Sequence, residues 1–191
     1  MDTVSFTQMK DGTKEDYLLL KSFELEYAKS SYRAILMALE GLKEGLLGYK
    51  ITRYEHSLQT ATRAYRDNAS DDMIIGCLLH DIGDIHAPFN HAQAAGAIIK
   101  PFVSEKVYWI VSHHDIFQKY YFVHHYGGDR DERLGYQDHP FYQDTIDFCE
   151  NWDQASFDPS YKSHSLDFFL PIFDGLFTES VKLESGALKN S

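Results

Sequence analysis

Histidine and aspartate side chains that could share a metal ion recur along this chain. His80 and Asp81 stand side by side, directly after the apolar run "IIGCLL". Imidazole and carboxylate groups bind divalent ions of intermediate hardness, and a buried carboxylate is costly unless it is paired or coordinated. Adjacent helical residues point about 100° apart. His80 and Asp81 can therefore hold different sides of one ion, or Asp81 can bridge two ions.

Further candidate ligands occur in other segments with a helical pattern. The full set has four histidines and two aspartates: His56, His80, Asp81, His91, His114 and Asp153. This number of donors exceeds the four ligands of a tetrahedral zinc ion and suits two ions that keep open positions. His113 precedes His114, but neighbouring helical residues point in different directions. We interpret His113 as a packing residue rather than a ligand.

The elements that must position these side chains are helices. Apolar residues recur at spacings of three and four over most of the chain, and no stretch has the pattern of a β-rich, turn-spaced fold. The sequence thus predicts the all-α class. We expect one helix from about Thr52, one over 71–83 with Gly83 as its terminator, one from Pro88 and one from Ser104.

The 191 residues predict a single domain with short additions at both ends. Residues 1–48 are expected to form a helical hairpin, broken near Ser30 and packed on a core of residues 49–180. Residues 181–191 are expected to form a flexible tail. The polar, glycine-rich segment 127–140 predicts a loop, and the sequence does not decide whether that loop is a lid.

Composition limits the classes of partner. The formal net charge is −11, which disfavours nucleic acid and anionic membrane surfaces. Cys77 and Cys149 lie in apolar helical contexts without CxxC spacing, which fits a reducing, cytoplasmic location. No apolar run has the length of a membrane span, and no secretory signal is visible. We expect a small-molecule substrate, no nucleic-acid or membrane partner, and a monomer or homodimer.

The order H…HD…H…H…D, together with "HDIG", resembles the HD-domain superfamily over roughly residues 50 to 177. This resemblance implies an HD-domain helical bundle that carries metal ions. It implies that one ion is held by His56, His80, Asp81 and Asp153. It also implies that a second ion is held by Asp81, His91 and His114.

Two classes of enzyme follow from the resemblance. Most HD proteins are phosphohydrolases, whereas the branch of organophosphonate-degrading oxygenases and myo-inositol oxygenase uses a mixed-valent di-iron centre. Gln59, three residues after His56, matches the oxygenase branch and could orient a ligand or a metal-bound water. The resemblance favours two iron ions (Fe2+/Fe3+) and dioxygen as co-substrate. The reaction would be oxidative cleavage of a small hydroxylated metabolite, of organophosphonate or quaternary-amine type.

The alternative is a phosphohydrolase that uses manganese or another divalent metal on a nucleotide or phosphomonoester. An inactive scaffold module would lack a ligand, and all six are present. The candidate catalytic residues are Gln59, Asp84 and Lys119. The candidate substrate contacts are Asp84, Lys119, Tyr49, Tyr120 and Glu150.

The substrate contacts divide by charge. Lys119 suits an acidic group of the substrate, whereas Asp84 and Glu150 suit an amine or ammonium beside aromatic faces. Asp84 stands where the phosphonate oxygenases have a histidine, and Glu150 stands where they have an arginine. Tyr49 stands in for a tyrosine that gates the second iron in those enzymes, although no equivalent glutamate is present. These departures place the phosphonate substrate in question and leave the metal ligands unaffected.

Overall fold

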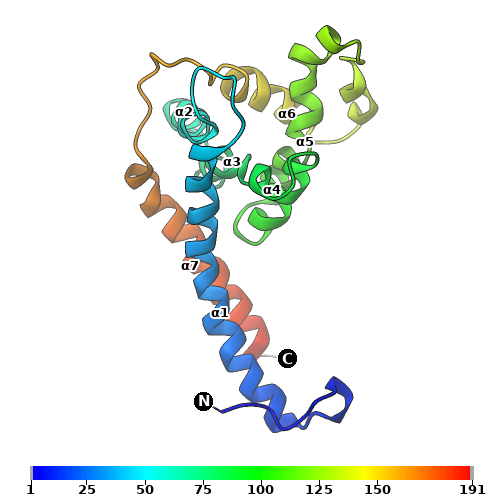
Figure 1. Ribbon diagram of the computed structural model, residues 1–191, viewed down its shortest axis with the longest axis vertical. Coiled ribbons are helices and arrows are strands. Elements are labelled where there is room, and N and C mark those ends of the chain that lie inside the picture. The colour runs from blue at the N-terminus through cyan, green and yellow to red at the C-terminus, as the bar shows by residue number, and fades with distance from the viewer. Residues whose placement is uncertain (1, 190–191) are drawn as a thin grey trace.

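A long helix pair forms a stalk below a helical head (Figure 1). The computed structural model describes the backbone of residues 2–189, and the side chains of these residues apart from Leu25 and 182–189. Throughout this described part the regular structure is helical, without strands, so the predicted all-α class is confirmed. The arrangement is consistent with an HD-type bundle. None of the described helices has the length and hydropathy required to cross a membrane.

Seven α-helices make up most of the described chain. They are α1 (Lys14–Gly41), α2 (Arg53–Arg66), α3 (Asp71–Leu79), α4 (His91–Ile99), α5 (Glu105–Phe122), α6 (Tyr142–Phe148) and α7 (Leu166–Lys189). Six short 3₁₀ helices precede or connect them: η1 (Met9–Asp11), η2 (Leu42–Glu44), η3 (Ile82–Ile85), η4 (Lys100–Phe102), η5 (Val123–Tyr126) and η6 (Glu132–Tyr136). A π-helical turn, η7 (Cys149–Asp153), follows α6.

The stalk differs from the N-terminal hairpin that the sequence predicted. Helix α1 is continuous over 28 residues, because the hydroxyls of Ser30 and Ser31 donate to carbonyls one turn earlier and do not interrupt the helix. Its neighbour is α7, which runs antiparallel to it (Figure 1). The ring of Tyr32 stacks on that of Phe173, with 4.8 Å between centroids. The expected break and hairpin are therefore wrong.

The C-terminal segment also forms part of the stalk. Helix α7 continues through Lys189, so most of the segment predicted as a flexible tail, 181–191, has a helical backbone. Residues 190–191 lie outside the described residues. The division into an extension of 1–48 and a core of 49–180 stays a prediction.

Two helix boundaries near the predicted metal ligands differ from the sequence prediction. Helix α3 ends at Leu79, and Gly83 lies within η3. Gly83 is needed there for close packing, since a Cβ at this position would lie 2.2 Å from the carbonyl oxygen of His91. Helix α4 begins at His91 rather than at Pro88. The predicted start at Thr52 is confirmed by a capping box with Glu55.

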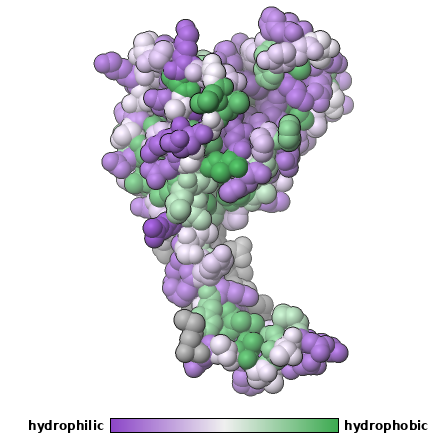
Figure 2. Space-filling model, in the orientation of Figure 1, coloured by the Kyte–Doolittle hydropathy of each residue, from purple (hydrophilic) through white to green (hydrophobic). Residues whose placement is uncertain are grey.

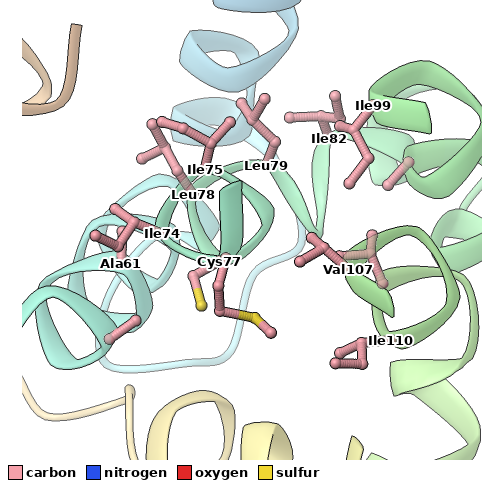
Figure 3. Packing of buried hydrophobic residues seen from close by; sticks show 14 of the residues in the cluster. Ala61, Ile74, Ile75, Cys77, Leu78, Leu79, Ile82, Ile99, Val107 and Ile110 are labelled. Atoms are coloured by element: carbon pink, nitrogen blue, oxygen red, sulfur yellow. The ribbon is translucent and has the colours of Figure 1, made fainter. Parts of the chain in front are cut away.

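The apolar core lies between α3 and its neighbours (Figure 3). Helix α3 contributes Ile75, Leu78 and Leu79, which are at most 1% exposed. Val107 of α5 packs against the same cluster. Helix α3 is thus enclosed by apolar side chains, and its C-terminal end places His80 and Asp81 inside the head.

Hydrophobic side chains also appear at separate places on the surface of the head and near the foot of the stalk (Figure 2).

Candidate metal centre

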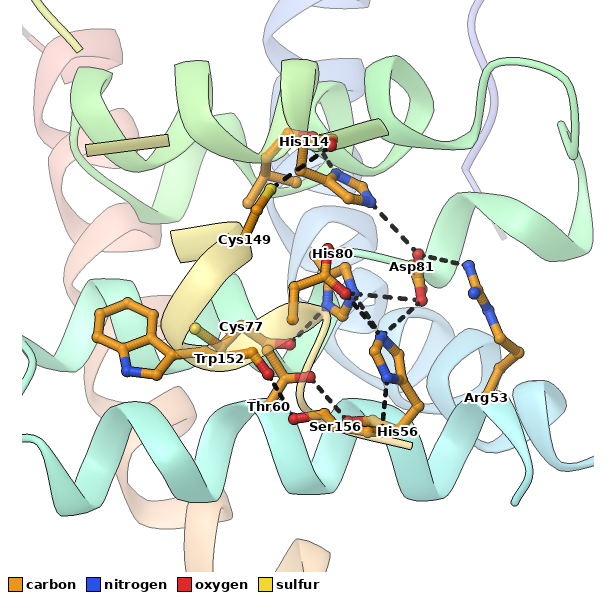
Figure 4. Close-up of polar contacts among 12 residues, drawn as sticks. Arg53, His56, Thr60, Cys77, His80, Asp81, His114, Cys149, Trp152 and Ser156 are labelled. Atoms are coloured by element: carbon orange, nitrogen blue, oxygen red, sulfur yellow. Dashed lines mark hydrogen bonds and ion pairs between the residues drawn. The ribbon is translucent and has the colours of Figure 1, made fainter. Parts of the chain in front are cut away.

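The six predicted ligands lie together inside the head, although five different segments supply them. Those segments are α2, the turn after α3, the start of α4, the middle of α5 and the π-turn η7. Five of the side chains are buried, and His91 is partly exposed. Figure 4 shows imidazoles from α2, the turn after α3, and α5 directed toward Asp81, with Arg53 also beside that carboxylate.

The first group of donors surrounds Oδ2 of Asp81. The Nε2 atoms of His56 and His80 are 3.1 Å apart, and they lie 3.5 Å and 3.2 Å from that oxygen. Oδ1 of Asp153 lies 3.2 Å from Nε2 of His56. These separations allow the four side chains to contact one small cation.

The second group faces the other oxygen of the same carboxylate. The Nε2 atoms of His91 and His114 are 3.3 Å apart, and each lies 3.5 Å from Oδ1 of Asp81. Asp81 therefore presents one oxygen to each group, which is the arrangement of a carboxylate that bridges two ions. The structure thus brings together the residues that the family resemblance assigned to each ion, and His80, His114 and Asp153 form a further such group across the two sets.

The imidazole tautomers show why a cation fits here. Nδ1 of His56, His80 and His114 lies 2.7–2.9 Å from a backbone carbonyl oxygen, that of Ser156, Cys77 or Val111 respectively. A carbonyl only accepts, so each neutral ring has its proton on Nδ1 and an unshared electron pair on Nε2. Two such pairs facing each other at 3.1 Å repel unless a cation lies between them.

The carboxylates support the same conclusion. The Oδ2 atoms of Asp81 and Asp153 are buried, yet they accept no hydrogen bond from any described residue. Buried polar atoms are rarely left without a partner. Imidazole nitrogens and carboxylate oxygens in this number are the donors of a two-ion site. The residues present therefore fit a pair of divalent metal ions.

The electrostatics keep the donors in their metal-binding forms. Burial alone would raise the pKa of Asp81, but Arg53 and then His80 hold it well below its usual value. Burial likewise opposes ionisation of Asp153, and its pKa is lowered by the hydrogen bond from His56 and the positive charge of the neighbouring histidines when these are protonated. Burial also lowers the pKa of His91, which favours its neutral form. At neutral pH these groups are two carboxylates and a neutral imidazole.

A network of ion pairs that the sequence did not reveal supports the second group. Nη2 of Arg53 lies 2.8 Å from both Asp81 and Asp84, and Oδ1 of Asp84 lies 3.4 Å from Nδ1 of His91. A carboxylate on the remote nitrogen of a ligating histidine fixes its orientation. Arg53 could have been found as a basic residue one helical turn before His56, on the same face.

The structure places Asp84 between Arg53 and His91, where its charge is compensated. Asp84→Asn is expected to weaken binding of the ion at His91 about 10- to 100-fold, since an amide cannot accept hydrogen bonds at both ends. The ion between His56 and His80 should stay bound. Titration against a competing chelator measures both affinities. Asp144→Asn, which removes a surface acid paired with Lys106, is the matched control, and equal loss from both sites would contradict the assignment.

Gln59 lies behind the metal centre rather than in it. Its side chain is buried and bonded to the backbone of Asp158, with Nε2 2.8 Å from the carbonyl oxygen. It thereby anchors the segment after η7, whose Ser156 carbonyl holds the ring of His56. The expectation that Gln59 contacts a metal-bound water therefore finds no support in this geometry.

A cavity of about 880 Å³ opens onto the metal centre. Three of the predicted substrate contacts line it: Tyr49, Asp84 and Lys119. Tyr120 and Glu150 are absent from its lining, and Tyr121 lines it instead. Tyr120 packs under the guanidinium groups of Arg130 and Arg133. Glu150 is exposed. The structure thus does not bring these two side chains to the metal centre.

Segment 127–140, the loop that the sequence could not assign as a lid, lies against α5. Arg133 of η6 packs over Tyr120 at 3.6 Å, and Glu132 pairs with Lys119 at 3.0 Å.

His113 stacks on Trp109 with 4.2 Å between centroids, and its Nδ1 lies 2.8 Å from the carbonyl of that residue. His113 therefore has the packing position that the sequence predicted.

Comparison with known proteins gives one partial similarity. The chain is 30% identical over 88 residues to [1-hydroxy-2-(trimethylamino)ethyl]phosphonate dioxygenase (glycine-betaine-forming) of Leisingera caerulea. The match covers 40% of this chain and 45% of that protein, so it spans less than half of either. No family model matches the chain. The similarity points to the dioxygenase branch that the histidine and aspartate pattern resembled.

Proposed function

We propose that this protein is an HD-type di-iron oxygenase that uses dioxygen to cleave a small hydroxylated organic molecule. The observation that carries the proposal is Asp81, which faces two groups of imidazoles with separate oxygens. The partial similarity to a phosphonate dioxygenase supports an oxygenase rather than a hydrolase. A pair of iron ions at this position would supply the activation of dioxygen and the electron transfers of the reaction.

The protein's own residues hold and surround the reacting groups. His56, His80 and Asp153 would bind one ion, His91 and His114 would bind the other, and Asp81 would bridge them. The backbone carbonyls behind three of the imidazoles keep their unshared pairs directed inward. The rigid ligand set avoids a cost of rearrangement during the reaction.

The cavity suits a substrate with an anionic group near a hydroxyl group. Arg53 lines the cavity beside the metal centre, where its Nη2 pairs with Asp81 and Asp84. This guanidinium is placed to bind a phosphonate or carboxylate. Tyr49, Tyr121 and Phe157 line the same cavity and offer aromatic faces to an ammonium group. An organophosphonate or a quaternary amine fits this combination.

Oxygen uptake tests the proposal. Protein loaded with iron without air and half-reduced should give the electron-spin signal of a coupled iron pair. It should then consume oxygen with 1-hydroxyalkylphosphonates and related hydroxylated amines. The variant His80→Ala should lose both properties. Two results together would instead identify a phosphohydrolase. The protein would release phosphate from p-nitrophenyl phosphate with manganese under nitrogen, and it would take up no oxygen with the hydroxylated phosphonates and amines.

A further inference from the structure

The cavity has two ends of different chemistry. Its inner end is formed by buried metal-binding side chains and Arg53. Its outer end carries exposed hydrophobic side chains, which we call the apolar rim: Leu46, Ile85, Phe89, Phe122 and Tyr126. Phe89 is fully exposed at 101%, and Tyr126 is 82% exposed.

The apolar rim comes from three separate parts of the chain. Leu46 follows η2, Ile85 and Phe89 lie between α3 and α4, and the two remaining residues end α5 and η5. Single exposed hydrophobic residues are ordinary on protein surfaces. Several around one opening form an apolar patch, and such patches mark sites of binding. Because all five line the cavity of the metal centre, we assign the rim to the ligand of that cavity.

The size of the cavity supports this assignment. Ligand sites that enclose drug-sized molecules have volumes of about 300–1,000 Å³, and this cavity of about 880 Å³ lies near the upper end of that range. A small polar metabolite held at Arg53 and the metal centre would fill only the inner part. The outer part would then keep water against five hydrophobic side chains.

We infer that the substrate is an amphiphile. Its hydroxylated, anionic end binds at the metal centre, and an alkyl or aromatic arm of several carbons lies along the apolar rim. This inference rests on the proposed function for the inner end only, because no rim residue is a metal ligand. Docking on anionic lipid is a less suitable explanation of the rim, since the chain carries a net charge of −11.

Chain-length dependence of binding tests the inference. The probes are 1-hydroxyethylphosphonate and 1-hydroxyoctylphosphonate, titrated into iron-loaded protein without oxygen. Each methylene group removed from water strengthens binding about fourfold. Burial of about half of the added methylenes therefore predicts at least about 50-fold tighter binding of the octyl compound. Equal affinities would overturn the inference and leave the proposed function standing.

Variants of the rim identify where the arm binds. Phe89→Ser should lower the ratio of octyl to ethyl affinity about tenfold, since it removes the most exposed ring of the rim. Phe23→Ser, which removes an exposed ring on the stalk, is the matched control and should leave the ratio unchanged. An unchanged ratio in Phe89→Ser would overturn the assignment of the arm to the rim.

A second readout does not depend on metal. The metal-free protein should bind anilinonaphthalene sulfonate, and octylphosphonate should displace this dye far better than ethylphosphonate. If octylphosphonate displaced the dye far better than ethylphosphonate while the iron-loaded protein consumed no oxygen with any hydroxyphosphonate, the proposed function would fail and the apolar arm of the ligand would stand. The protein could instead bind phosphatidylcholine vesicles, lose this binding in Phe89→Ser, and show no chain-length dependence with the hydroxyphosphonates. That result would make the rim a membrane contact and overturn the inference.

Discussion

Asp81→Asn is expected to remove both metal ions from the protein. Asparagine nearly keeps the shape of aspartate, but only one of its two terminal atoms is an oxygen. Its amide nitrogen cannot bind a cation, and it would donate hydrogen bonds to the imidazole nitrogens that should bind the metal. Oδ2 of Asp81 serves the group of His56 and His80, and Oδ1 serves the group of His91 and His114. The change therefore removes a ligand from each ion and the negative charge between them.

Metal analysis of purified protein measures this loss. Unmodified protein should contain about two ions per chain, and Asp81→Asn close to none. Asp153→Asn should keep about one, because the ion pairs of Asp153 are with His56 and His80 of the first group. Asp115→Asn is the control, since this acid lines the same cavity but bonds the backbone of its own helix. Two ions in Asp81→Asn would contradict the bridging role.

Gly83→Ala is expected to destabilise the head and to displace His91. The new methyl carbon would lie 2.2 Å from the carbonyl oxygen of His91 and 2.9 Å from its Cα, so backbone would have to move. Overpacking of this kind costs about 3 kcal/mol or more when no flexible side chain can yield. In a chain of this length that cost lowers the melting temperature by about 10 °C.

Thermal unfolding in the presence of a chelator separates this effect from metal binding. Gly135→Ala is the matched control, because nothing lies within 4 Å of a Cβ at that position and no left-handed backbone angle is found there. It should change stability by less than about 0.5 kcal/mol. A melting temperature for Gly83→Ala equal to that of the control would show that η3 and α4 do not pack as closely as described.

The donors could be predicted from the sequence because their chemistry is rare inside proteins. An apolar run that ends in His80 and Asp81 places charged groups where only a metal or a strong pair compensates burial. Arg53 was missed because a basic residue in the first turn of a helix is usually solvated. Its pairing with Asp81 and Asp84 depends on how α2 packs against the turn after α3, which periodicity does not show.

The errors among the substrate contacts have geometric causes. Tyr120 and Tyr121 are adjacent on α5, so only one of them can face the cavity, and it is Tyr121. Glu150 lies three residues before Asp153, a spacing that shares a face in an α-helix. These residues form a π-turn, in which the amide of Gln154 bonds the carbonyl of Cys149. The wider turn changes which residues share a face, and Glu150 is exposed.

The pairing of α1 with α7 has a consequence for biosynthesis. Helix α1 packs against α7, so the contact of Tyr32 with Phe173 forms only after residue 173 has been synthesised, long after α1. A nascent chain on the ribosome carries α1 with its apolar stripe uncovered (Tyr32, Ile35, Leu36 and Leu39), and chaperones bind such stripes. Premature termination before α7 leaves that stripe permanently bare, and the truncated product is the form most prone to aggregate.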